Sequence, residues 1–115
     1  MSISTFEDVV AWQKAKQLTT VVYKEMNSCK DYGFKDQLQR ASVSVMNNIA
    51  EGFERRSNKE LAQFLYIAKG SAGEARSMII LAKELGYISE TTYQELSQLV
   101  MECSRLVSGF IKSIK

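Results

Sequence analysis

Two carboxylates, Glu51 and Glu74, are the strongest candidates in the sequence for acid–base chemistry. A catalytic pair must reach one substrate together. Glu51 lies near the end of one predicted helix and Glu74 about half a helix along the next, so at ~1.5 Å per residue they are too far apart. The chain also has no His, which excludes Ser-His-Asp and Cys-His machinery. We therefore expect no catalytic residues and no enzymatic activity.

The same composition removes the common metal and cofactor sites. Without His there is no HExxH site, no C2H2 finger and no Glu-x-x-His di-iron site. The spacing of Cys29 and Cys103 matches no metal signature. The segment from Gly70 to Gly73 lacks the preceding strand and the GK[ST] of a phosphate loop. We expect no metal and no cofactor, with Cys103 in the core and Cys29 near a helix end.

Basic residues offer the remaining chemistry, which is the binding of phosphates. Arg55, Arg56 and Lys59 lie in a predicted turn, and Lys112 and Lys115 lie near the C-terminus. In an up-down-up-down bundle this turn and the C-terminus share one end, although acidic residues nearby partly neutralise the cluster. We expect these five residues to contact nucleic-acid phosphates. An oligomer would repeat the cluster, and summed phosphate contacts raise affinity.

The composition indicates one helical domain that spans residues 1–115. The chain has 115 residues, 45% hydrophobic and 24% charged, with a net charge of +2. That length is typical of a single domain, and the charge is far below that of a strongly basic nucleic-acid-binding domain. No run of residues has the length and hydrophobicity of a membrane span, and the opening residues lack the pattern of a signal peptide. We expect a cytoplasmic protein without membrane contact.

Hydrophobic periodicity predicts four helices joined by short turns, hence an all-α, up-down-up-down antiparallel bundle. The first helix begins near Thr5, which caps the amide of Asp8, and the second covers residues 34–53. The third follows a capping box that starts at Ser57 and runs to about residue 85. The fourth follows Ser89 and carries a heptad seam, made of Tyr93, Leu96, Val100, Cys103, Val107, Phe110 and Ile114.

Two further patterns concern packing. The second helix carries one apolar stripe for the core and another about a third of a turn away, which predicts a homo-oligomer interface. In the third helix, the small residues from Gly70 to Gly73 predict a close helix crossing, since Gly is otherwise costly in a helix. The second stripe, our predicted interface, consists of Val43, Met46, Ala50 and Phe53.

Four polar residues of the second and third helices are assigned structural roles: Arg40, Asn48, Glu51 and Glu74. Antiparallel packing brings Arg40 and Glu74 to similar heights, which makes an ion pair between them possible, within or between subunits. Buried polar groups of this kind can fix helix register and partner choice.

Four blocks of sequence, in order and at the right spacings, resemble one known family. Residues 6–13 (FEDVVAWQ) are similar to its opening F-x-D-L-x-V-W-Q, and residues 37–45 (QLQRASVSV) to its Q-L-R-R-A-A-x-S-I. Residues 48–52 match N-I-A-E-G, and residues 64–71 (FLYIAKGS) resemble F-L-x-I-A-x-G-S. The chain thus resembles the bacterial four-helix-bundle proteins encoded in intervening sequences of 23S rRNA genes. Gln39 departs from the pattern, where the family often has a second Arg.

The resemblance implies a four-helix bundle. It also implies assembly and nucleic-acid binding, because a relative of the family has both properties. That relative, the accessory protein of diversity-generating retroelements, forms a ring-like pentamer, binds nucleic acid and partners a reverse transcriptase. We therefore predict a non-enzymatic homo-oligomer, a pentamer by this resemblance, that binds RNA in preference to DNA through backbone contacts. The alternative is a scaffold that docks another protein, such as a reverse transcriptase.

Overall fold

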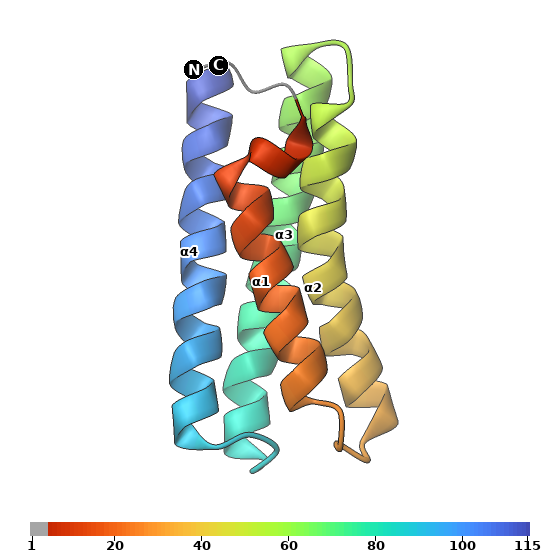
Figure 1. The fold of residues 1–115 in the computed structure, drawn as a ribbon, viewed down its shortest axis with the longest axis vertical. Helices are drawn as coiled ribbons and strands as arrows, with labels where there is room; N and C mark the ends of the chain where they lie inside the picture. Colours follow the sequence, from red (N-terminus) through yellow and green to blue (C-terminus); the bar gives the residue numbers. More distant parts are fainter. Residues whose placement is uncertain (1–4) are drawn as a thin grey trace.

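The computed structural model describes residues 5–115, which form four long helices after one short turn of helix (Figure 1). The turn η1 covers Phe6–Asp8. The helices are α1 (Val10–Glu25), α2 (Tyr32–Phe53), α3 (Asn58–Glu84) and α4 (Glu90–Ile114). They run up-down-up-down, and the described residues contain no strand. The prediction of an all-α four-helix bundle is confirmed.

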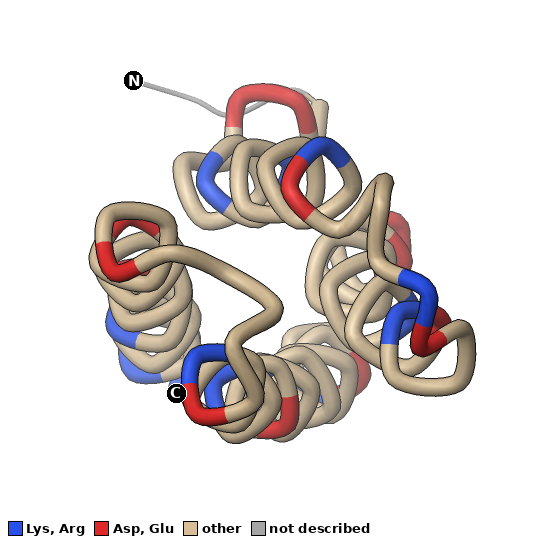
Figure 2. Tube along the Cα trace, turned by 90° about the horizontal axis from the view of Figure 1, so that it is seen from below, with Lys and Arg blue, Asp and Glu red and all other residues tan. Residues whose placement is uncertain are grey.

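Each helix packs on the two that are adjacent to it around the bundle axis (Figure 2). The α2 and α4 helices both pack against α1 and both pack against α3, so that α1 and α3 lie diagonally across the core. The outer surface is hollowed between the neighbouring helices α3 and α4.

Polar side chains cap three of the helices and fix where they start. The Asp31 carboxylate accepts from the Phe34 amide at 3.2 Å, which starts α2 two residues before the predicted position. The Ser57 hydroxyl accepts from the Glu60 amide at 3.2 Å, and the Ser89 hydroxyl from the Thr92 amide at 3.1 Å. These bonds satisfy amides that have no partner inside the helix.

The predicted start of the first helix is wrong. Thr5 does cap a helical turn, but its hydroxyl accepts from the Glu7 amide at 3.0 Å and that turn is the 3₁₀ helix η1. Val9 is then extended and 4% exposed, and α1 begins only at Val10. We attribute the interruption between η1 and α1 to the burial of Val9. A continuous helix from Thr5 would give Val9 a different position.

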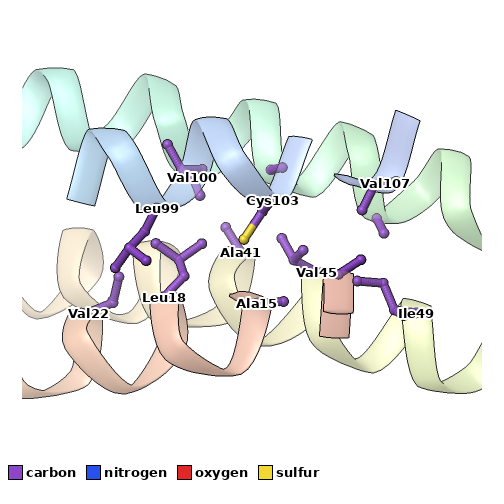
Figure 3. Close-up of a cluster of buried hydrophobic side chains, with 14 of the residues drawn as sticks. Ala15, Leu18, Val22, Ala41, Val45, Ile49, Leu99, Val100, Cys103 and Val107 are labelled. Atoms are coloured by element: carbon purple, nitrogen blue, oxygen red, sulfur yellow. The ribbon is translucent and has the colours of Figure 1, made fainter. Parts of the chain in front are cut away.

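The side chains of one face of every helix meet in a single core (Figure 3). The heptad seam of α4 is confirmed: its four central residues are buried, and Tyr93, Phe110 and Ile114 are half-buried against the core. Small residues on the inner face of α3 allow its neighbours to approach. The buried alanines of that face are Ala68, Ala72, Ala75 and Ala82.

The two cysteine thiols differ in their exposure to solvent, which leads to a testable prediction. Cys103 is 0% exposed, and burial raises the pKa of its thiol to about 12. Cys29 is half-buried near the end of α1. Since the thiolate is the reactive form, we expect one thiol per chain to react rapidly with a thiol reagent in the native state and two after denaturation. Fast native reaction of both thiols, or of Cys103 in a Cys29→Ser variant, would contradict this.

The predicted close crossing at Gly70 and Gly73 is also wrong. A Cβ added at either position would have no neighbouring atom within 4 Å, because both glycines lie on the outer face of α3. The close approach is instead at Gly52, where a Cβ would lie 2.8 Å from Cβ of Phe64 and 3.0 Å from Leu61. The α2–α3 contact therefore depends on a glycine in α2.

Candidate functional site

The predicted basic cluster divides into two groups in the structure. Arg55, Arg56 and Lys59 are exposed around the turn between α2 and α3, and this turn shares an end of the bundle with the C-terminus (Figure 1). Arg55 lies just after α2 and contacts both flanking helices: its Nη2 lies 2.6 Å from Oε1 of Glu51 on α2, and its guanidinium packs 4.6 Å from the centre of the Phe64 ring on α3. Much of the charge of Arg55 is therefore already compensated.

Lys112 and Lys115 lie in the outer groove between α3 and α4, which we call the basic groove. Its upper part is a hollow of about 760 Å³, open to solvent. A second hollow of about 240 Å³ continues it along the same two helices and shares Ser104 and Arg105 with it. Besides those two, the upper hollow is lined by Tyr66, Lys69, Ser108, Gly109, Ile111, Lys112 and Lys115.

The basic groove carries cations without acidic neighbours. No Asp or Glu lines either hollow, and none occurs in segments 61–73 and 103–115, which form most of its walls. The salt bridges among residues 5–115 involve none of its basic side chains. In the view along the bundle axis, basic positions of α4 gather on its side toward α3 (Figure 2). The groove cations are Lys69, Arg76, Arg105, Lys112 and Lys115.

Helical periodicity explains how these residues come together. Residues three, four or seven apart share a helix face, so Lys69 and Arg76 align along α3, and Arg105 and Lys112 along α4. The antiparallel packing of the two helices then places the rows opposite each other. Gly73 and Gly109, which have no side chains, leave room between the rows.

The residue types of this groove suit the binding of anions. Its polar groups are ammonium, guanidinium and hydroxyl groups, which are the usual partners of phosphate oxygens. Among the residues that the structure describes, no group of His, Cys, Asp and Glu could hold a metal ion. No helix of the described part is long and apolar enough to cross a membrane.

The predicted oligomer interface of α2 is partly used within the subunit. Met46 and Phe53 are half-buried and pack against the core, whereas Val43 and Ala50 are half-buried without belonging to that set. The exposed apolar surface lies mainly on α3. Its large exposed side chains there are Tyr66, Ile67, Ile80 and Leu81, and the exposed Leu85 follows at the C-cap.

The structural polar residues are placed differently from our expectation. Within the subunit Arg40 does not pair with Glu74; its Nε lies 3.0 Å from Oδ2 of Asp36, one turn earlier on the exposed side of α2. The side-chain amide Nε2 of Gln37 instead donates to Oε2 of Glu74 at 3.5 Å. Arg40 is therefore paired within α2.

A second polar contact between α2 and α3 is made by two serines that were not predicted from the sequence. The hydroxyls of Ser44 and Ser71 lie 2.8 Å apart. Asn48 supports them, since its side-chain amide donates to the carbonyl and hydroxyl oxygens of Ser44 at 2.8 and 3.0 Å. Asn48 thus adds to the polar contact between α2 and α3 through Ser44, which lies four residues before it.

An apolar hollow of about 460 Å³ lies between the N-terminal end of α1 and the C-terminal half of α4. Leu106 and Phe110 line it, and so does Val10, whose side chain is 53% exposed. Asp8 and Arg105 contribute the charges at this hollow. Its composition suits an apolar side chain of a partner protein better than a polyanion.

Comparison with known proteins identifies the fold family. The family model of the 23S rRNA-intervening sequence protein matches residues 7–109. The chain belongs to this family. The family resemblance found in the sequence is confirmed at that level, and the match covers α1, α2, α3 and most of α4.

One solved structure has the same fold. It is a protein of unknown function from the S23 ribosomal protein family of Bacteroides thetaiotaomicron, with a TM-score of 0.83 and 24% identity, over 89% of this chain and 98% of that one. Comparison with curated proteins gives no match. These comparisons thus show the family and the fold, whereas the features of the surface are the basis for a function.

Proposed function

We propose that the protein is a non-enzymatic, homo-oligomeric bundle that binds nucleic acid, RNA in preference to DNA, through phosphate contacts. The observation that carries the proposal is the basic groove, whose cations have no carboxylate partner among the described residues. Unpaired cations in a groove attract a polyanion and gain affinity from released counterions. The family description refers to 23S rRNA, which makes RNA the first probe.

The proposed contact residues shift from the turn to the groove. Lys112 and Lys115 remain from the sequence-based set, and Lys69, Arg76 and Arg105 join them. The turn residues Arg55, Arg56 and Lys59 become flanking contacts, since Arg55 is already paired with Glu51.

A salt titration with matched variants tests this function. Fluorescein-labelled RNA is titrated with wild type, with Arg105→Ala/Lys112→Ala and with Arg55→Ala/Arg56→Ala at several salt concentrations. Each lost phosphate contact lowers the slope of log K against log salt by about one unit. We expect the groove variant to lose about two units and the turn variant less, although both lose the same formal charge. A groove variant that matches wild type in slope and affinity would contradict the proposal.

The homo-oligomer is the second element of the proposal, and the pentamer follows only from the resemblance to the retroelement accessory protein. Exposed apolar residues on α3, with Leu81 46% exposed, and Val43 on α2 are the surfaces available for it. We expect light scattering to report a multiple of the 13.0 kDa subunit. Val43→Glu and Leu81→Glu should each leave the helical content intact, and the one that dissociates the oligomer identifies the interface. A 13.0 kDa species for wild type at micromolar concentration would refute this element.

The apolar hollow between α1 and α4 favours a second candidate function, that of a scaffold for another protein such as a reverse transcriptase. Val10 is exposed there beside an apolar wall. Under this function, Val10→Glu should abolish binding of the partner protein while RNA binding is unchanged. If wild type binds neither RNA nor DNA at low salt, the scaffold becomes the leading function.

A further inference from the structure

An aromatic ring lies among the cations of the basic groove. Tyr66 lines the upper hollow with Lys69 and Lys115, and it is 48% exposed. An exposed Tyr in a basic groove is the combination by which proteins bind single strands: cations follow the phosphates and a ring stacks on a base. Sequence analysis cannot show it, because the ring and most of the cations belong to different helices.

The side chain of Lys115 holds the Tyr66 ring in place, and this contact does not cover the faces of the ring. Nζ of Lys115 donates to the Tyr66 hydroxyl at 2.7 Å and lies 5.2 Å from the ring centre. The two distances place the ammonium out beyond the hydroxyl and not above the ring. Lys115 therefore orients the ring without covering it.

The shape of the groove favours a single strand over a duplex. Neighbouring helix axes in a bundle are about 8–10 Å apart, so a duplex could touch the rims of the groove but not its floor. The hydroxyls of Ser104 and Ser108 line the interior and are reached by a strand that enters it. Along α3, Tyr66 to Arg76 covers about 15 Å at ~1.5 Å per residue, which is enough for a few nucleotides.

We propose that the basic groove binds single-stranded nucleic acid, with one base stacked on Tyr66 and the flanking phosphates on the cations of α3 and α4. This inference rests on the proposed function, because it requires that the groove bind nucleic acid at all. Beyond the proposed function, it specifies that the ligand is single-stranded and that an uncharged residue, Tyr66, contributes to the affinity.

The test compares a fluorescein-labelled 12-nucleotide oligo-U RNA with a labelled 12-base-pair RNA duplex, for wild type, Tyr66→Leu and Tyr66→Phe. We expect wild type to bind the single strand more tightly. Tyr66→Leu should weaken single-strand binding by about five-fold to a hundred-fold, the range for one stacked base, without changing the salt slope. Tyr66→Phe keeps the ring but loses the hydrogen bond from Lys115, so it should weaken single-strand binding much less than Tyr66→Leu does.

The outcomes distinguish the two proposals. If wild type binds neither probe at low salt, the proposed function fails and the inference fails with it. If wild type binds but Tyr66→Leu binds the single strand equally well, or the duplex binds as tightly, the function stands and the stacking inference is overturned. Circular dichroism is the check that both variants fold. We expect that they do, because the side chain of Tyr66 is half-exposed. A loss in Tyr66→Phe equal to that in Tyr66→Leu would assign the effect to the hydroxyl and also overturn stacking.

Discussion

Replacing Gly52 with Ala is expected to lower the free energy of unfolding by about 1–3 kcal/mol, the usual cost of overpacking. The added methyl group would lie 2.8 Å from Cβ of Phe64 and 3.3 Å from the backbone carbonyl of Leu61. Neither atom is the free end of a flexible side chain, so α2 and α3 must move apart. Urea denaturation monitored by circular dichroism measures the change.

Gly70→Ala is the matched control, because it makes the same chemical change in the same pair of helices. No atom lies within 4 Å of the added methyl group, and Ala is favoured over Gly inside a helix by about 1 kcal/mol. We expect Gly70→Ala to stabilise the protein. Equal effects of the two substitutions would contradict the assignment of the close approach to Gly52.

Leu18→Ala should destabilise the protein by about 2–5 kcal/mol, the range for removing a buried leucine side chain. Leu18 is 0% exposed and lies in the core with Val22 and Leu99 (Figure 3). Small domains have a total stability of about 5–15 kcal/mol, so this substitution removes a large part of it. The expected result is a markedly lower midpoint in thermal and urea denaturation.

Leu81→Ala is the control for that experiment, and it also reports on assembly. Leu81 is 46% exposed on α3, so within one subunit its truncation should change stability by less than about 0.5 kcal/mol. A larger loss that depends on protein concentration would show that the outer face of α3 is covered in an oligomer. If Leu18→Ala were as mild as Leu81→Ala at low concentration, the core assignment would be wrong.

The helices and most of their caps were predictable because the signals are local. Ser57 and Ser89 lie directly before helical periodicity and cap the amides three residues on. The seam of α4 likewise depends only on spacing within one helix. The start of α1 was not predictable in this way, since the interruption at Val9 follows from its burial against other helices.

The candidate site was predictable only in part, because it depends on which helix faces meet. Lys112 and Lys115 were identified, but their partners Lys69 and Arg105 come from a pairing of α3 with α4. One signal was available: segments 61–73 and 103–115 both lack acidic residues and would lie antiparallel in the expected bundle. The partner of Arg40 within the subunit was not predicted either, because helical periodicity gives a position along α2 and does not choose between Asp36 and Glu74 as the ion-pair partner.

The position of Trp12 makes the protein easy to follow by its intrinsic fluorescence. Trp12 is the single tryptophan of the chain, it is half-buried on α1, and its ring lies 5.1 Å from that of Phe6 in η1. Because its ring contacts Phe6, this indole reports on the docking of η1 onto α1. A shift in its emission on addition of ligand would therefore be an optical sign that the N-terminal turn moves.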